Sequence, residues 1–299
     1  MQLTINLSQP FNLDYTLNSG QAFRWRKIEG SWYGMIGPAA VKATQIKDKL
    51  QIESDEELGE KTILRYFGLV DDLPRIYESI SKDRHIETIL KNYQGLRIMR
   101  QDPWETIISF ITATNINLKR VESSLNKLCQ RKGSPKIFNN VLMYTFPTPQ
   151  AILEIKNDDL REAGFGYRAQ WIREAARVVV SEPDLIRSLA EQSYESARAL
   201  LLSKIFTGVG EKATDCILLF GFNKFESFPI DRWVRQSILY HYAHLFEANL
   251  IDNLKLKRSL DGALYNKIRK IMIEYFGRYA GYAQQYLFMH ERLSSRFQT

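Results

Sequence analysis

The chain has 299 residues, and 41 lysines and arginines against 34 acidic residues give it a net charge of +7. This length fits about two domains of roughly 150 residues each, and the charge favours a polyanionic partner. Two cysteines, Cys129 and Cys216, exclude a disulfide framework and a four-thiolate iron–sulfur cluster, and the four histidines lack zinc-ligand spacing, so we predict no metal site among them.

Residues 1 to about 54 alternate apolar and polar side chains, as strands do. Turns at 29–30 and 47–49 separate the runs, which predicts an antiparallel sheet, with 23–25 as part of one strand. Helical periodicity begins near Lys61, and no convincing strand follows it. We predict an α+β fold: an N-terminal antiparallel sheet domain with helices over 1–92, and a helical domain over 93–299 made of two all-α subdomains.

The first residues alternate like a strand rather than forming a signal peptide, and no apolar run approaches the roughly 18 residues of a membrane helix. We therefore expect an intracellular protein without membrane attachment, and a monomer. Gly20 falls in a loop between the early strands, where the residues alone indicate a plain connection.

Asp102 and Pro103 begin a helix that ends at a polar break over 112–117. An amphipathic helix over 118–129 follows, and Asn117 is predicted to cap it. Capping is also the alternative interpretation of Asn115.

The next loop is rich in glycine and contains Tyr167 and Arg168, just before a helix over 170–180. An aromatic ring and an arginine in such a loop suit invasion of a duplex, because the ring fills the space of an extruded base and the guanidinium addresses the orphan partner. Packing of Tyr167 on the adjacent helix is the alternative, and both interpretations stay open.

Gly208 and Gly210 flank Val209 between helices predicted over 194–204 and 211–220, which makes a helix-hairpin-helix. Amides at the start of the second helix suit a DNA phosphate, and the same positive dipole end disfavours an ammonium on Lys212. Lys212 is thus a candidate amine nucleophile. Hairpins of this kind are also common as non-catalytic DNA anchors, in which the lysine only contacts a phosphate. The hairpin alone does not decide between a nucleophilic lysine and a phosphate contact.

Asp231 follows Pro229 at the start of another helix, where an aspartate is usually a cap. Near the C-terminus, a mainly helical stretch over 261–292 places Gln284 and Phe288 on one face, since they are four residues apart. Aromatic-rich helices of this type are more often core than binding surface.

Together these stretches resemble a known family. The Gly-Val-Gly-x-Lys hairpin with an aspartate nineteen residues after the lysine is similar to the base-excision DNA glycosylase superfamily. Three further motifs resemble the 8-oxoguanine DNA glycosylases: Ser-Gly-Gln-x-Phe-Arg-Trp at 19–25, Gly-Tyr-Arg-Ala at 166–169 and Ala-Gln-x-x-Leu-Phe at 283–288. The chain departs from the family pattern at Ile116, where an asparagine is usual, at Thr207, where a proline is usual, and at 232–233, where a histidine-containing run is usual.

The resemblance implies a bifunctional DNA glycosylase/AP lyase that flips 8-oxoguanine, preferably opposite cytosine, out of duplex DNA in a cleft between the helical subdomains. Lys212 would attack the anomeric carbon while Asp231 stabilises the transition state, and β-elimination would follow through a Schiff base. No cofactor is required, although the family suggests a structural cation held by hairpin carbonyls near Phe206 and Val209.

The resemblance also implies roles for the other motif residues. Gly20 would offer its carbonyl to the hydrogen that oxidised guanine carries and guanine lacks, Gln284 would bind the base edge, and Phe288 and Cys216 would cover the two faces of the base. The residues implied to contact DNA are Asn115, Arg120 and Arg168 around the orphan cytosine, Tyr167 as the wedge, and Gly208 and Gly210 at the phosphate.

Two other functions remain open from the sequence. A monofunctional alkylated-base glycosylase would share the hairpin and Asp231 but would need neither Lys212 nor Gly20. A non-enzymatic damaged-DNA-binding protein would use Lys212 and Asp231 as ordinary contacts. Borohydride trapping on a lesion duplex separates these hypotheses, because only an amine-linked intermediate is trapped.

Overall fold

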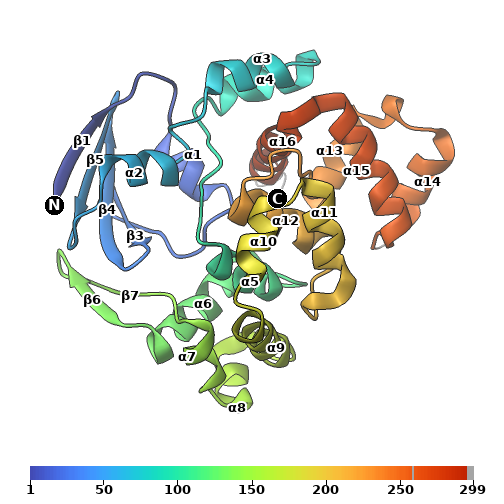
Figure 1. The fold of residues 1–299 in the computed structure, drawn as a ribbon. Coiled ribbons are helices and arrows are strands. Elements are labelled where there is room, and N and C mark those ends of the chain that lie inside the picture. The colour runs from blue at the N-terminus through green and yellow to red at the C-terminus, as the bar shows by residue number, and fades with distance from the viewer. Residues whose placement is uncertain (258, 295–299) are drawn as a thin grey trace.

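The computed structural model describes residues 1–257 and 259–294, and a five-stranded antiparallel sheet lies at one side of it (Figure 1). The strand order is β1-β5-β4-β3-β2. The strands are β1 Gln2–Asn6, β2 Arg26–Ile28, β3 Ser31–Ile36, β4 Ala39–Ile46 and β5 Lys49–Ser54. The predicted sheet is confirmed, except that residues 23–25 lie outside it. A short helix, α1 Leu13–Asn18, interrupts the strand pattern, and the Asn12 side chain caps the start of this helix.

Both faces of the sheet are covered. Leu3 pairs with Ile52 and Ile5 with Leu50, so these apolar side chains share the face that packs against α1 and α2 Glu60–Tyr66. The opposite face contributes Tyr33 to a smaller cluster. This double burial explains why every residue of β3 is buried.

A two-stranded hairpin, β6 Pro135–Phe138 and β7 Val141–Tyr144, covers that second face by placing Met143 beside Tyr33. Its two turn residues, Asn139 and Asn140, have φ of 48° and 61°, the left-handed pair that a tight hairpin turn requires. The prediction that no strand follows the N-terminal sheet is therefore wrong at this point. The hairpin extends the sheet domain with residues from the helical part of the chain.

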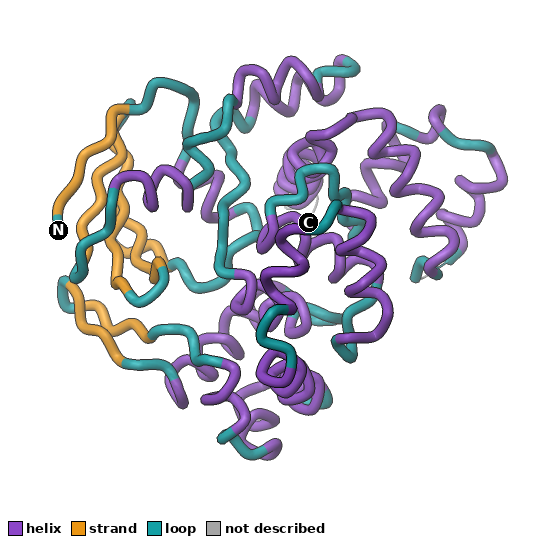
Figure 2. The backbone as a smooth tube through the Cα atoms, viewed as in Figure 1, coloured by secondary structure: helices purple, strands orange, loops and turns teal. Residues whose placement is uncertain are grey.

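The rest of the described chain is mainly helical, as predicted (Figure 2). Its apolar side chains form a second, larger core. The longer helices are α3 Leu73–Ile80, α4 Arg84–Asn92, α5 Pro103–Thr112, α6 Leu118–Lys132, α9 Arg168–Ser181, α12 Glu211–Phe222, α13 Arg232–His241, α14 Ala248–Leu256, α15 Gly262–Phe276 and α16 Ala280–Ser294. The shorter ones are α7 Pro149–Leu153, α8 Asn157–Leu160, η1 Arg161–Phe165, α10 Leu185–Glu191, α11 Tyr194–Leu200, η2 Leu201–Ile205, η3 Ala243–Leu245 and η4 Gly277–Tyr279. Within the described residues, no helix combines the length and the apolar character needed to cross a membrane.

The last helix joins the two parts of the chain. On α16, Tyr282 donates a hydrogen bond of 2.9 Å to Asp71, and Gln285 donates one of 2.7 Å to the Ser19 carbonyl. Both contacts reach back to the N-terminal segment, so α16 lies directly beside the loop that carries Gly20. The predicted domain boundary at residue 92 stays a prediction.

Candidate active site

A cleft of about 1190 Å³ opens where the loop after α1, the α5–α6 connection, the hairpin and α16 meet. Most of the residues singled out in the sequence line it: Gly20, Asn115, Gly208, Gly210, Lys212, Cys216, Asp231, Gln284 and Phe288. Arg120, Tyr167 and Arg168 do not line it. The structure thus brings together side chains that lie up to 268 positions apart, from Gly20 to Phe288.

The hairpin forms as predicted. Helix α11 continues through η2, the chain turns at Gly208 with φ +82°, and α12 begins after Gly210. A Cβ on Gly208 would lie 2.2 Å from the Trp171 ring, so this position needs glycine both for its backbone angle and for the close approach of α9. The tight turn leaves the start of α12 facing the cleft, and with it Lys212.

Lys212 is half-buried in the second position of α12, and its Nζ lies 5.3 Å from the centre of the Phe110 ring. Burial lowers the pKa of Lys212, but the neighbouring Cys216 and Asp231 raise it, and the net pKa lies above its usual value. The ammonium form that the helix start by itself disfavours is thus favoured by these two neighbours, Cys216 and Asp231. Attack on a sugar carbon needs the neutral amine, so this proton has to leave before the reaction.

Asp231 caps α13, as predicted. Its Oδ1 accepts hydrogen bonds of 2.9 Å from the amides of both Trp233 and Val234. Burial raises the pKa of Asp231 above its usual value, although Lys212 and these two amides act to lower it. The cap therefore fixes the direction of the carboxylate through Oδ1. Neither of these two backbone hydrogen bonds goes to Oδ2, the other carboxylate oxygen.

On the other side of the cleft, Gly20 has φ +76° and lies against Phe288 of α16. A Cβ at Gly20 would meet the Phe288 ring at 3.2 Å. Gln284, one turn earlier, is buried, and its Oε1 finds no hydrogen-bond partner within the described chain. A buried amide oxygen left unpaired in a cleft is suited to a ligand that donates hydrogen bonds. Burial raises the pKa of the Cys216 thiol to about 11, so it contributes an uncharged surface.

The conformation of the Gly20 loop depends on Gln21, whose role the sequence analysis missed. Gln21 is buried and donates to the carbonyls of Thr16 and Arg97, and its Oε1 accepts the Met99 amide at 2.7 Å. Its neighbour in the motif, Arg24, forms a two-pronged ion pair with Glu105 at 2.7 and 2.8 Å. These contacts give the Ser-Gly-Gln-x-Phe-Arg-Trp motif a structural basis, since they attach the loop to the chain before and within α5.

The predicted DNA contacts occupy different surroundings. Asn115 is exposed, with φ +55°, and Arg120 is exposed in the first turn of α6, where the predicted Asn117 cap accepts the Arg120 amide at 3.0 Å. Tyr167 packs edge-on against Trp171 of α9 with ring centres 4.9 Å apart, yet it stays 54% exposed. Both interpretations of Tyr167 thus hold in part: it rests on the helix and still projects.

Arg168 departs from the expectation. Its guanidinium is buried, and Nε donates to the Thr114 carbonyl at 2.8 Å, as does one terminal nitrogen. The residue is the first of α9, so its side chain folds back towards the α5–α6 connection rather than outward. The structure does not present Arg168 as a ready reader of an orphan base; that role stays a prediction and requires the Thr114 contact to break.

The hairpin carbonyls of Phe206 and Val209 are the groups that would hold the predicted cation. The Phe206 carbonyl accepts the Val209 amide at 3.3 Å, and a carbonyl oxygen has a second lone pair, so the turn is compatible with an ion. Such an ion would supply positive charge for a DNA phosphate, without a part in the chemistry. The cation stays a prediction.

Two of the four histidines, which we expected to be structural or surface residues, belong to a cluster outside the cleft that the sequence spacing did not reveal. His85, His241 and Glu291 place ligand-type atoms within 4.8 Å of one another. The two imidazoles stack face to face, with centres 3.6 Å apart and planes 13° apart. Nitrogen lone pairs lie in the ring planes, so parallel rings do not direct them at one point, and we interpret the group as packing.

Comparison with known proteins identifies the family. Residues 2–107 match the family described as 8-oxoguanine DNA glycosylase, N-terminal domain, and residues 108–251 match the HhH-GPD superfamily of base excision DNA repair proteins. The chain is 30% identical to a probable N-glycosylase/DNA lyase of Methanothermobacter thermautotrophicus, over 95% of this chain and 94% of that protein.

Solved structures agree. The chain superimposes with a TM-score of 0.84 and 31% identity on MBOgg1 in complex with a low affinity DNA ligand, covering 98% of this chain and 96% of that one. The 8-oxoguanine glycosylase/lyase of Clostridium acetobutylicum, solved with double-stranded DNA containing cytosine opposite 8-oxoG, gives a TM-score of 0.83 at 25% identity, over 99% and 98% of the two chains. With the hairpin lysine and the capping aspartate in one cleft, the chain belongs to the 8-oxoguanine DNA glycosylase/lyase family within the helix-hairpin-helix superfamily.

Proposed function

We propose that this protein is a bifunctional DNA glycosylase/AP lyase that removes 8-oxoguanine from duplex DNA, with Lys212 and Asp231 as its catalytic residues. The observation that carries the proposal is the placement of these two side chains. They interact electrostatically with each other on one side of a cleft, and the opposite side of that cleft presents Gly20, Gln284 and Phe288. The proposal includes action as a monomer on double-stranded DNA inside the cell.

The cleft fits an extruded oxidised guanine. Phe288 offers a ring for stacking, and Cys216 offers a neutral thiol for the opposite face. The unpaired Oε1 of Gln284 is an acceptor, and the Watson–Crick edge of guanine carries N–H donors. The Gly20 carbonyl then separates the lesion from guanine, because an acceptor facing an unprotonated ring nitrogen stays unpaired, at a cost of about 1–3 kcal/mol.

The reaction begins when neutral Lys212 attacks the anomeric carbon of the flipped nucleotide. The bond between that carbon and the base breaks, and the base leaves with the electron pair and takes up a proton. Positive charge develops on the sugar in this step, and the Asp231 carboxylate, aimed by its two amide bonds, stabilises it. The anomeric carbon then carries the Lys212 nitrogen and the ring oxygen, and breakage of its bond to the ring oxygen gives a Schiff base on Lys212. Loss of a proton from the adjacent sugar carbon then expels the 3′ phosphate.

The base opposite the lesion is read by exposed Arg120 and, once it leaves the Thr114 carbonyl, by Arg168. Both side chains only donate hydrogen bonds, and an orphan cytosine offers two neighbouring acceptors, whereas adenine places an amino donor on that edge. This arrangement favours cytosine, while Tyr167 fills the space of the extruded base.

Borohydride trapping on a duplex with 8-oxoguanine opposite cytosine tests the proposal. We expect a covalent adduct with the unmodified protein and none with Lys212→Gln, while duplex binding persists. Lys119, an exposed lysine that lines the same cleft, supplies the control: Lys119→Gln keeps the adduct. An adduct with Lys212→Gln would make another amine the nucleophile. Base release by the unmodified protein without any adduct would make the enzyme monofunctional.

A further inference from the structure

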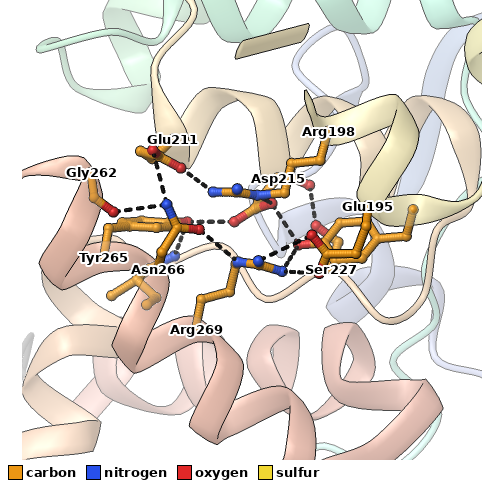
Figure 3. Close-up of polar contacts among 11 residues, drawn as sticks. Glu195, Arg198, Glu211, Asp215, Ser227, Gly262, Tyr265, Asn266 and Arg269 are labelled. Carbon is orange, nitrogen blue, oxygen red and sulfur yellow. Dashed lines mark hydrogen bonds and ion pairs between the residues drawn. The ribbon is translucent and has the colours of Figure 1, made fainter. Parts of the chain in front are cut away.

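The fully buried Asp215 of α12 forms the centre of a polar network (Figure 3). Its Oδ1 accepts hydrogen bonds from the Tyr194 hydroxyl at 2.8 Å and from Arg198 Nε at 3.0 Å. Its Oδ2 accepts the Tyr265 hydroxyl at 2.8 Å. Asp215 lies three residues after Lys212 on the same helix, so these bonds fix the part of α12 that presents the nucleophile.

Each of the two hydroxyls also accepts a hydrogen bond: Tyr194 accepts one from Arg269 at 2.9 Å, whereas the bond to Tyr265 comes from the backbone. The second contact of the Tyr265 hydroxyl links it to the catalytic aspartate. This hydroxyl accepts the backbone amide of Ile230 at 3.0 Å, and Ile230 immediately precedes Asp231. Burial and the nearby Asp215 raise the pKa of Tyr265 well above its usual value, so the hydroxyl keeps its proton and donates to the carboxylate. One oxygen atom thus joins the helix of Lys212 to the segment of Asp231.

Helix α12, at one end of this link, has more supporting contacts than the segment before Asp231 at the other end. Helix α12 has further contacts, because Arg198 pairs with Glu211 as well as Asp215, and Asn266 also donates to Glu211, at 3.3 Å. Ile230 is buried, and among the hydrogen bonds of the described residues its amide has Tyr265 as its partner. Ser227 anchors the start of the segment by donating to the Asp215 carbonyl at 2.8 Å, three residues before Ile230. Loss of the Tyr265 hydroxyl therefore releases the aspartate more than the lysine.

We propose that Tyr265 is a positioning residue. Its hydroxyl holds the connection between α12 and α13, which ends at Asp231, in place against α12. The Asp231 carboxylate therefore faces the sugar while the base–sugar bond breaks. This inference rests on the proposed function, since it assigns Asp231 to that step. Tyr265 acts through Asp231 and does not itself react. Removal of its hydroxyl leaves the Ile230 amide buried and unpaired, so the segment shifts to find another acceptor.

The test compares Tyr265→Phe with Tyr194→Phe. Each variant removes one donor to Asp215 and one hydrogen-bond acceptor. In Tyr194→Phe the lost acceptor served Arg269, which keeps its ion pair with Glu195, whereas only Tyr265→Phe removes the acceptor of the Ile230 amide. Two single-turnover rates are measured on each protein: release of 8-oxoguanine from a lesion duplex, and strand nicking of a duplex that already contains an abasic site. Nicking needs Lys212 but not breakage of the base–sugar bond. Affinity for an uncleavable abasic-site analogue duplex is measured alongside.

We expect Tyr265→Phe to lose base release at least tenfold, with nicking and affinity changed less than threefold, whereas Tyr194→Phe keeps all three. Equal losses of release and nicking in Tyr265→Phe, or equal losses of release in both variants, overturn the inference in favour of a purely structural role. If Tyr265→Phe does not fold, p-aminophenylalanine at this position keeps a donor for Asp215 and removes a good acceptor, and the same split is expected. Failure of the unmodified protein to release 8-oxoguanine would instead remove the proposed function.

Discussion

Substitution Gly20→Ala tests whether the glycine loop forms one side of the base pocket. Gly20 has φ +76°, an angle that costs a residue with a side chain roughly 1–2 kcal/mol. Its new methyl group would meet the Phe288 ring at 3.2 and 3.4 Å and Leu118 at 3.4 Å. The shorter contact forces a shift of a few tenths of an ångström, and both the Gly20 carbonyl and Phe288 belong to the proposed pocket.

Gly30→Ala is a matched control. Gly30 has φ +83°, in the turn between β2 and β3, and nothing lies within 4 Å of a Cβ placed there. Both variants therefore bear the same backbone strain, partly offset by about 0.4–1 kcal/mol from the stiffer unfolded chain. We expect each to lose about 1 kcal/mol of unfolding free energy. Only Gly20→Ala also disturbs the carbonyl contact, worth about 1–3 kcal/mol, so its excision should fall by about tenfold or more.

Urea unfolding measures the stability of the two variants, and single-turnover release of 8-oxoguanine opposite cytosine measures their activity. Excision of unmodified guanine is followed in parallel, because a misplaced carbonyl lowers the preference for the lesion as well as the rate. If Gly20→Ala excises the lesion as fast as Gly30→Ala does, while both are equally destabilised, then Gly20 does not contact the base and the pocket assignment fails.

Asp231→Asn should keep its stability within about 1 kcal/mol, because asparagine caps a helix as well as aspartate, yet lose base release by about a hundredfold or more; near-normal release would reduce Asp231 to a cap. The unmodified protein should release the lesion about tenfold or more faster opposite cytosine than opposite adenine, and Arg120→Ala should reduce this preference with little change in stability. Equal release rates opposite both bases in the unmodified protein would contradict the assignment of the arginines as cytosine readers. Burial lowers the pKa of His85 from 6.5 to about 4, so the unfolded chain binds more protons between these values and unfolding free energy should fall as the pH drops from 6.5 to 4. His85→Phe should flatten that part of a urea-derived stability curve, and an unchanged slope would assign the loss to other groups.

Local patterns predicted much of the fold because they depend on neighbours in the sequence. The caps at Asn117 and Asp231 follow from short-range hydrogen bonds, and the structure contains both. The β6–β7 hairpin was missed because its strands are four residues each and one begins at Pro135, a residue that argues against a strand. The pair Asn139-Asn140 was the available signal, since asparagine tolerates left-handed angles better than most residues.

The site residues that stand within motifs were predictable from the sequence, but the buried residues that hold them in place were not. Lys212 and Asp231 stand in recognisable contexts, whereas Asp215, Tyr194 and Tyr265 read as ordinary positions on helices. The three meet only because α11, α12 and α15 pack together, since Tyr194 and Tyr265 lie 71 positions apart in the chain. Arg168 shows the opposite case: its motif resembles a DNA contact, yet its guanidinium donates to the Thr114 carbonyl, a partner that the sequence does not reveal.

The polar network around Asp215 follows from what the catalytic pair requires. Lys212 and Asp231 attract each other, so a flexible support would let them collapse into a direct ion pair that blocks both roles. Apolar packing restrains volume but gives little control over direction, whereas a hydrogen bond to a buried carboxylate restrains distance and angle together. A buried ionic cluster adds little net stability over apolar residues of the same size, so its value in this fold lies in geometry. Lys212 is held from one side by α12 and Asp231 from the other by its cap, and the Tyr265 hydroxyl connects the two supports.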